Sequence, residues 1–457
     1  MIVMKVAKFG GSSLADGAQL KKVIKIIVAD DKRQVIVTSA PGKRDKNDTK
    51  VTDLLITYAK QTLQRQDTSA ICQAIFDRYL AIAQYFALPE ENLTELHKIL
   101  FELKDHVYPD AKYLMAAFKA HGERLNAYLI AKILNHLGIK ARFIDPKEVG
   151  FLVTSEPNNA TVLPQTYQAL AQLPVGEERL IVPGFFGLTK EGQIATFSRG
   201  GSDITGAILA CALKAECYEN FTDVDAIYVA NPKIVTDPAA ITTMTYREMR
   251  ELAYAGFSVF HDEAIIPAIQ GQVPINVKNT NHPELPGTWI VPETGFMPTQ
   301  TITGVVNSNH FSALYLHKYL LNKEVGATLK LLEIMYKYQI SYEHMPSGID
   351  DLTIIFDSDL LTPETKQLMC EDIQAALQPD QLEWIDDYAI IMVVGEGMRD
   401  HKGVTQKIID SVSEHDIGIH MINQGASRIS LMLGTKRADA ANAVKYIYQT
   451  FFEEENK

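Results

Sequence analysis

The stretch Lys8-Phe9-Gly10-Gly11-Ser12-Ser13 is the starting point for interpreting the fold. An apolar run over residues 3–9 ends at the two glycines, and apolar residues at helical spacing follow from Leu20 to Ile27. This order predicts a strand, a glycine turn and a helix. Glycines let a backbone approach an anion, and the free N–H groups of a helix start favour phosphate. The lysine precedes the glycines, so this is not a GxxxxGK[ST] loop, and a tight structural turn would explain the same glycines.

Strand-like and helix-like segments alternate outward from this turn over the first two-thirds of the chain. Residues 51–58 show helical spacing, and residues 70–137 are predicted to be mostly helical. The further predicted strands are residues 35–37, 141–144, 180–182 and 226–229. Strands that alternate with helices predict an α/β sandwich with a mainly parallel sheet.

The last third of the chain contains an internal repeat. It follows a stretch rich in proline and glycine, residues 281–300, which is typical of a domain boundary. Residues 327–332 match residues 404–409, and residues 352–355 match residues 429–432 at the same offset. Each copy reads as strand, glycine-containing loop, helix, strand, turn and strand. The repeat therefore predicts two βαββ modules packed side by side.

The composition is that of a globular protein with several domains. A chain of 457 residues is too long for one ordinary core. The net charge of -12 argues against a general nucleic-acid binder, because phosphate backbones need a basic face. The four cysteines form no CxxC pair, and we find neither a signal peptide nor an apolar run of membrane-spanning length. We therefore expect a cytoplasmic protein with reduced thiols.

Two further clusters place polar side chains beside predicted strands. The sequence FSRGGSD (residues 197–203) precedes a helix, where Arg199 can hold a carboxylate with two hydrogen bonds and Asp203 lies beside the turn. Ser202 or Asp203 can equally cap that helix. The polar residues of segment 220–233 follow a strand, and ligands bind at strand ends in open α/β sheets.

In this order and at these separations, the motifs resemble those of the aspartate kinases of the amino-acid kinase superfamily. The matching stretches are KFGGSSL (8–14), VTSAPGKR (37–44), HGERLNA (121–127), FSRGGSD (197–203) and FTDVDAIYVANPK (221–233). The repeat resembles the tandem ferredoxin-like ACT domains that follow the kinase domain in this family. The resemblance implies a kinase domain over residues 1–297, a first ACT domain over 310–382, and a second formed by 301–309 and 386–457.

The resemblance also implies the reaction, in which ATP phosphorylates the β-carboxylate of L-aspartate to give 4-phospho-L-aspartate. This is the first step of lysine, threonine and methionine biosynthesis. Lys8 would stabilise the transferred phosphoryl group, and Asp203 would orient lysines around it. A carboxylate acceptor is already ionised at neutral pH, so no chemical base is required. Mg²⁺ would bridge the phosphates and need few protein ligands, and we expect no metal site built from side chains.

The same resemblance assigns binding roles by position. Glu123 would bind the α-ammonium of aspartate and Arg199 its α-carboxylate. The residues expected to contact aspartate are Ser39, Ala40, Thr52, Glu123, Arg199, Gly200 and Ser202. Those expected to contact the nucleotide are Lys8, Gly10, Gly11, Ser12, Thr222, Asp223, Tyr228 and Lys233.

One segment departs from the family pattern. Many members carry a lysine in a GAKVLH segment that contacts the nucleotide phosphates, whereas residues 256–261 here read GFSVFH. Ser258 therefore stands where that lysine would be. The change weakens the prediction of nucleotide contacts and leaves the substrate class unaffected. His261 and its acidic neighbours match a helix start in the family, so we do not read them as a metal site.

The resemblance of the repeat to ACT domains also implies a regulatory site for a small amino acid. By resemblance it would involve Gly326, Ala327, Thr328, Glu343, Ser347, Gly348, Ile349 and Asp350. Glu343 and Asp350 favour lysine as the effector, with threonine as the alternative, although the same residues can equally be solvated turn residues. ACT pairing between chains implies a homodimer or a dimer of dimers.

Two rival interpretations remain open at this point. A kinase for another acidic group, such as glutamate, acetylglutamate or carbamate, would share the glycine turn. A catalytically silent amino-acid sensor would explain Ser258, but Lys8, Arg199 and Asp203 are all present.

Overall fold

The structure is a computed structural model that describes residues 4–198, 200–257 and 262–453. The chain divides into two compact units, and each is described by itself. The first unit comprises Met1–Ile227, Ala240–Arg250 and Ser258–Phe296. The second comprises Tyr228–Ala239, Glu251–Phe257 and Met297–Lys457.

A mainly parallel sheet forms the centre of the first unit. Among the described residues, eight strands lie in the order β3-β4-β2-β1-β7-β9-β10-β8, and only β9 and β10 run antiparallel to each other. The carboxyl ends of the neighbouring strands β4, β2, β1 and β7 therefore lie along one edge of the sheet. In sheet order the strands are Ala141–Phe143, Arg179–Pro183, Arg33–Thr38, Lys5–Phe9, Cys217–Thr222, Ile275–Asn279, Thr288–Val291 and Thr243–Thr245.

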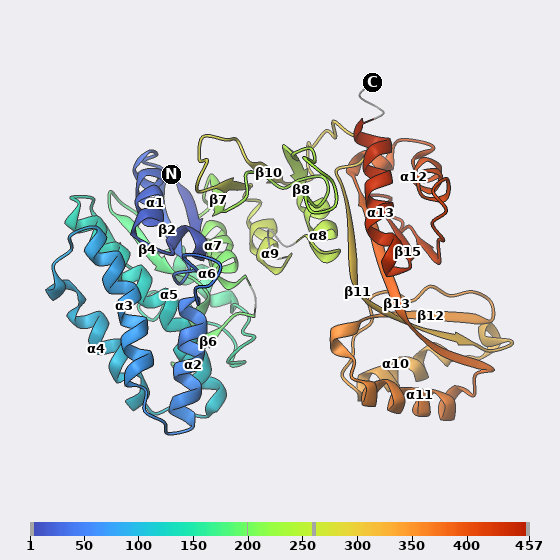
Figure 1. Cartoon of the computed structure of the whole chain (residues 1–457), viewed down its shortest axis with the longest axis horizontal. Helices are drawn as coiled ribbons and strands as arrows, with labels where there is room; N and C mark the ends of the chain where they lie inside the picture. The colour runs from blue at the N-terminus through green and yellow to red at the C-terminus, as the bar shows by residue number, and fades with distance from the viewer. Residues whose placement is uncertain (1–3, 199, 258–261, 454–457) are drawn as a thin grey trace. The chain divides into compact units, whose positions relative to one another are not determined.

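Helices pack against this sheet and against one another. Figure 1 shows α2, α3, α4 and α5 side by side, and α5 and α7 contact strands of the sheet. Asp16 and Asp110 cap α1 and α5 by accepting hydrogen bonds from backbone N–H groups of the first turn. The helices are α1 Gly17–Val28, α2 Val51–Leu63, α3 Ser69–Tyr85, α4 Thr94–Glu102, α5 Ala111–His136, α6 Pro164–Leu170, α7 Gly201–Ala212, α8 Tyr246–Tyr254 and α9 Asp262–Gly271. A small hairpin adds β5 Phe186–Leu188 and β6 Ile194–Thr196.

One predicted strand is wrong. Residues 226–229 form no strand, and the strand of this region is β7, which ends four residues earlier at Thr222. Its sequence CYENFT hides the strand because Glu219 and Asn220 are polar but buried. Arg33 donates to Glu219, with Nε 2.6 Å from the carboxylate, and Asn220 donates to Asp203. Paired polar side chains inside the sheet therefore conceal the apolar pattern on which the prediction relied.

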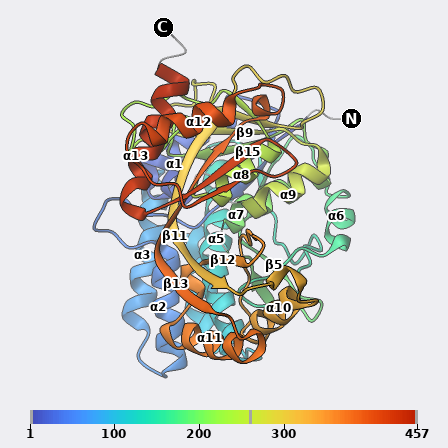
Figure 2. The same cartoon turned by 90° about the vertical axis from the view of Figure 1, so that its right-hand side faces the viewer.

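The second unit contains an antiparallel sheet shared by two helix pairs. Among the described residues, the strand order is β12-β11-β13-β15-β14, and the two long strands β11 and β13 run through the whole sheet. Figure 2 shows α10 beside α11 and α12 beside α13. The elements are β11 Gly304–His317, α10 Ala327–Lys337, β12 Asp351–Asp357, α11 Pro363–Leu377, β13 Gln381–Val394, α12 Val404–Ser413, β14 Met421–Asn423, β15 Ser430–Thr435 and α13 Arg437–Tyr448.

The sequence repeat corresponds to equivalent elements of this unit. Its first matching segment begins α10 in one copy and α12 in the other, and its second falls in β12 and at β15. The predicted fold class, a mainly parallel α/β sandwich followed by two ferredoxin-like modules, is confirmed. Within the described ranges, no helix combines the length and apolar character that a membrane crossing requires.

Candidate active site

Lys8 lies in a buried polar cluster at the carboxyl edge of the sheet. Its ammonium nitrogen is 2.6 Å from Oδ1 of Asp203, which lies in the first turn of α7. Asn220 of β7, the residue paired with Lys8 across the two strands, places its Oδ1 3.4 Å from the same ammonium. Asn220 also donates its side-chain N–H to Asp203 over 2.7 Å. The cluster holds one cation in a fixed position directly before the glycine turn.

The glycine turn after β1 packs against the turn after β2. The N–H of Gly10 donates to the carbonyl of Phe221, and the carbonyl of Gly11 accepts from Gly42 over 2.8 Å. A Cβ at Gly11 would lie 2.9 Å from the carbonyl oxygen of Ala40, so this contact requires glycine. Ser12 is exposed on the outer side of the turn. The predicted phosphate turn and the predicted aspartate-binding turn are therefore direct neighbours.

Glu123, in the middle of α5, is buried beside the turn that follows β2. The preceding residue, Gly122, lies against Ala40 and Thr52, because a Cβ there would be 2.8 Å from the Cβ of Ala40 and 3.9 Å from Oγ1 of Thr52. Within the described part of the chain, Oε2 of Glu123 has no hydrogen-bond partner. Burial raises the pKa of Glu123 from an ordinary 4.5 to about 8, and the N–H of Ala40 opposes part of that rise. A buried carboxyl with an unpartnered oxygen is suited to receive a cationic group from a ligand.

The structure brings most of the predicted aspartate contacts together. Asn126, one turn after Glu123, donates to the carbonyl of Ser39 over 2.7 Å and fixes the turn that also carries Ala40. Gly200, with φ of 62°, precedes α7, and Ser202 is buried in the first turn of that helix. Arg199 lies outside the described residues, as do Ser258 and His261.

The predicted nucleotide contacts are divided between the two units. Thr222 is the last residue of β7, and its hydroxyl donates to Asp223, which is exposed. Tyr228 and Lys233 belong to the second unit. Lys233 is exposed, and its N–H donates to the side chain of Asn231 over 3.0 Å.

Asn220 and Asn126 are site residues to which the sequence interpretation gave no role. Asn220 lies inside the cluster of residues 220–233, and Asn126 lies inside HGERLNA. The one available signal was an amide in an apolar setting, because buried amides are normally hydrogen-bonded to something specific. Their partners are distant in sequence, so the sequence did not identify them.

Comparison with known proteins identifies the family. A model of the amino acid kinase family matches residues 4–279, and a model of the ACT domain matches residues 391–451. Aspartokinase 3 of Bacillus subtilis is 45% identical over 449 residues, which cover 98% of this chain and 99% of that protein. The chain belongs to the aspartokinase family. This membership confirms the sequence-based prediction of an aspartate kinase with C-terminal ACT modules.

Two other members of the aspartokinase family are similar along their whole length. The crystal structure of Clostridium acetobutylicum aspartate kinase has a TM-score of 0.87 at 35% identity, and the match covers 98% of this chain and 100% of that one. Lysine-sensitive aspartokinase 3 of Escherichia coli is 25% identical over 460 residues, or 98% of this chain and 99% of that protein.

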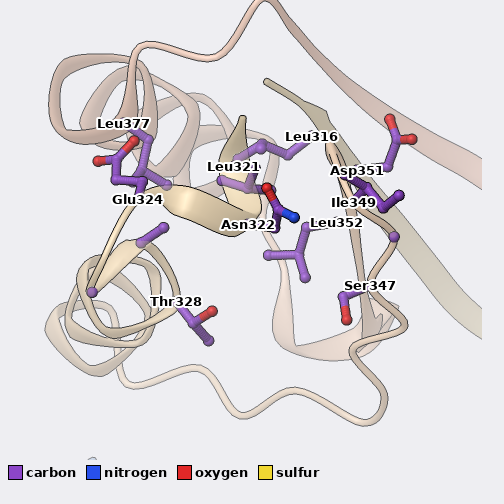
Figure 3. A pocket seen from close by; sticks show the side chains of 13 residues that line it. Leu316, Leu321, Asn322, Glu324, Thr328, Ser347, Ile349, Asp351, Leu352 and Leu377 are labelled. Carbon is purple, nitrogen blue, oxygen red and sulfur yellow. The ribbon is translucent and has the colours of Figure 1, made fainter. Parts of the chain in front are cut away.

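The second unit of this aspartokinase contains a cavity of about 290 Å³ beside α10. Figure 3 shows Glu324 and Thr328 on one side of it and Ser347 and Ile349 on the other. Six of the predicted effector residues line the cavity: Gly326, Ala327, Thr328, Ser347, Gly348 and Ile349.

The other two predicted effector residues have different surroundings. Glu343 accepts a short hydrogen bond from the hydroxyl of Tyr254, and Asp350 accepts from the N–H of Leu320 over 2.8 Å. The acidic residues that line the cavity are instead Glu324 and Asp351. The charge argument for lysine, which rested on Glu343 and Asp350, therefore does not apply to this cavity.

Both acidic residues of the cavity already have partners. Lys318 and Lys330 donate to Glu324, and these bonds lower the pKa of its carboxyl to about 2. Asp351 accepts from the hydroxyl of Tyr315 over 2.6 Å and from Nδ1 of His317 over 2.7 Å. The charge of the cavity is thus partly neutralised before any ligand binds.

Proposed function

We propose that the chain transfers the γ-phosphoryl group of ATP to the β-carboxylate of L-aspartate. The observation that carries the proposal is the buried Lys8 ammonium, held 2.6 Å from Asp203 directly before the Gly10-Gly11 turn. An oxygen of the β-carboxylate attacks the γ-phosphorus, the bond to the β-phosphate oxygen breaks, and ADP leaves. Lys8 stabilises the negative charge on the transferred group. Asp203 and Asn220 fix its position, and neither accepts a proton from the acceptor.

The acceptor site follows from the neighbouring turn. Glu123 receives the α-ammonium of aspartate, because its buried oxygen lacks a partner among the described residues. Ser39, Ala40, Thr52, Gly200 and Ser202 surround the substrate, and Arg199 binds the α-carboxylate. Gly10, Gly11, Ser12, Thr222, Asp223, Tyr228 and Lys233 contact ATP.

Mg²⁺ enters this scheme with the nucleotide. No group of three His, Cys, Asp or Glu side chains within the described residues is arranged to hold a metal ion. Mg²⁺ prefers phosphate oxygens and water to cages built only from protein ligands. We therefore propose MgATP as the substrate; Mg²⁺ would be held mainly by the nucleotide and would supply positive charge to its phosphates.

The second unit is proposed to sense an end-product amino acid in the cavity beside α10. One relative bears the name lysine-sensitive aspartokinase, which keeps lysine ahead of threonine as the candidate. The reaction would then be a feedback-regulated first step of lysine, threonine and methionine biosynthesis in the cytoplasm. We keep the sequence-based domain boundaries as part of this proposal: 1–297 for the kinase domain, 310–382 for the first ACT domain, and 301–309 with 386–457 for the second.

A homodimer is the proposed assembly, formed through the first ACT module. Val325, Leu329 and Tyr336 lie on or directly before α10 and are 98%, 60% and 77% exposed. Such a group of large apolar side chains is typical of a surface that another chain covers.

Light scattering should give twice the mass of the chain for the wild type and the mass of one chain for Leu329→Glu. Ile422→Glu, a half-exposed position of β14, is the control and should stay dimeric.

The test of the reaction is ADP formation from MgATP with L-aspartate, L-glutamate or no acceptor, each with and without lysine and threonine. Turnover confined to aspartate supports the proposal, and inhibition by one amino acid names the effector.

Lys8→Ala should lower kcat by about two to three orders of magnitude, while circular dichroism should show that the fold is retained. Arg199→Ala should raise the aspartate KM rather than the ATP KM. Absent turnover with thermal stabilisation by an amino acid would indicate a silent sensor instead.

A further inference from the structure

Lys119 lies one helical turn before Glu123 on α5 and is half-buried. Its ammonium is 5.7 Å from the centre of the Phe185 ring, a cation–π distance. Burial lowers the pKa of Lys119, and the charge of Glu123 opposes that shift. The two side chains are four residues apart on one helix and share a face of it, so their charges interact.

Phe185 connects this helix to the start of α7. Its backbone has a φ of 79°, and its N–H donates to Oγ1 of Thr205 over 3.1 Å. Its ring lies directly against Gly201, the first residue of α7, where a Cβ would be 2.6 Å from ring carbon Cδ2. Ser202 and Asp203 follow in the same turn. Lys119 thus contacts, through one aromatic ring, the helix start that holds Lys8.

We propose that Lys119 is a positioning residue for the amino-acid substrate. Its ammonium favours the charged form of the Glu123 carboxylate and, through Phe185, holds the first turn of α7 in place for the acceptor. This inference rests on the proposed function and deepens it, because it adds a residue that determines how tightly the acceptor binds.

Apart from Lys119, the neighbours of Glu123 named here carry no positive charge that would stabilise its carboxylate. The charge of Lys119 lowers the pKa of Glu123, whereas burial raises it. Tyr79 of α3 is also coupled to Glu123, but its phenol is buried, its pKa is raised well above 10, and its hydroxyl donates to the carbonyl of Gly122. Thr52 of α2 and Ala40 after β2 are uncharged neighbours.

The experiment compares Lys119→Met with Lys119→Arg and Lys132→Met. Lys132 is the matched control, because it lies on the same helix with its ammonium 5.3 Å from the Tyr128 ring, more than two turns beyond Glu123. Lys119→Met should raise the aspartate KM roughly tenfold while kcat and the ATP KM change less than about twofold. Lys119→Arg, which keeps the charge and the ring contact, should restore the KM. Lys132→Met should behave as wild type.

A second readout is independent of turnover. Carbon-13 titration of the glutamate carboxyls, with Glu123 assigned through Glu123→Gln, should show the Glu123 pKa about one unit higher in Lys119→Met. The aspartate kcat/KM should then reach its plateau at a correspondingly higher pH. If Lys119→Met does not fold, Lys119→Gln takes its place.

The outcomes separate the two proposals. An unchanged Glu123 titration overturns the role of Lys119 whatever happens to the KM, and so does an equal effect of Lys132→Met. Wild-type protein that forms no ADP with aspartate refutes the proposed reaction, whereas the titration still decides whether Lys119 controls the charge of Glu123.

Discussion

At the scale of a single residue, the burial of Glu123, the proposed binding group for the substrate ammonium, opposes stability at alkaline pH. Burial raises the pKa of its carboxyl to about 8 in the folded protein, against an ordinary value of 4.5. Between these values the folded state holds a proton that the unfolded chain has lost. The contribution of Glu123 to folding is therefore complete below pH 4.5 and is lost as the pH rises towards 8.

Glu123→Gln tests this conflict because glutamine resembles the protonated carboxyl at every pH. The variant should unfold at the same temperature as wild type at pH 4 and at a higher temperature at pH 8.5, by roughly 2–4 °C per kcal/mol recovered. It should also lose most of its affinity for aspartate. Calorimetry at both pH values checks the shift, and Glu95→Gln, at an exposed position of α4, should show none. Equal melting temperatures of variant and wild type at pH 8.5 would contradict the buried, proton-binding state.

At the scale of elements, the two ACT modules carry the same helix start with different surroundings. Gly326 precedes α10 and Gly403 precedes α12, both with φ of 84° and with open space where a Cβ would be. In the first module Thr328 and Ser347 line an open cavity. Their equivalents in the second module, Thr405 and Gln424, are hydrogen-bonded to each other over 3.4 Å. A side-chain hydrogen bond thus joins in the second module the two positions that line the cavity in the first.

Gly326→Ala and Gly403→Ala form a matched pair of variants. Each should lower the free energy of unfolding by about 1–2 kcal/mol, because an L-residue resists the left-handed region. Only Gly326→Ala should also change the amino-acid concentration needed for half-inhibition. Denaturant unfolding and inhibition curves measure the two effects. An equal change of inhibition in both variants would show that the effector site is not the cavity beside α10.

At the scale of the whole molecule, α8 passes from one compact unit into the other. Residues Tyr246–Arg250 belong to the first unit, whereas Glu251–Phe257 belong to the second. Tyr254 at its end donates to Glu343, and its ring lies edge-on to His344 at 5.9 Å. Burial, and then the bond to Glu343, raises the pKa of this phenol well above its ordinary value, so the hydroxyl stays a donor. Residues 343–348 continue from this contact to the cavity wall at Ser347 and Gly348.

Tyr254→Phe should therefore weaken inhibition by the effector more than it weakens binding of the effector. The variant lacks the hydrogen bond to Glu343, so the concentration for half-inhibition should rise several-fold while calorimetric affinity changes by less than about twofold. Tyr342→Phe, at a nearby exposed tyrosine, is the control. Inhibition identical to wild type would mean that this hydrogen bond has no part in the response to the effector.

Features that depend on local periodicity and on glycine could be predicted from the sequence. The strand-turn-helix around Gly10 and Gly11, the α/β alternation and the two-module repeat all follow from residues close together in the chain. Strand β7 was missed for the same reason, because its buried polar residues break the local pattern.

Only the tertiary structure decided which distant side chains meet. Lys8 and Asn220 are 212 residues apart and become neighbours because β1 and β7 pair in the sheet. The carboxylates that line the cavity, Glu324 and Asp351 in place of Glu343 and Asp350, were likewise set by packing. The physical reason is that charge and hydrogen bonding act over a few ångströms of space, whereas sequence patterns report only neighbours along the chain.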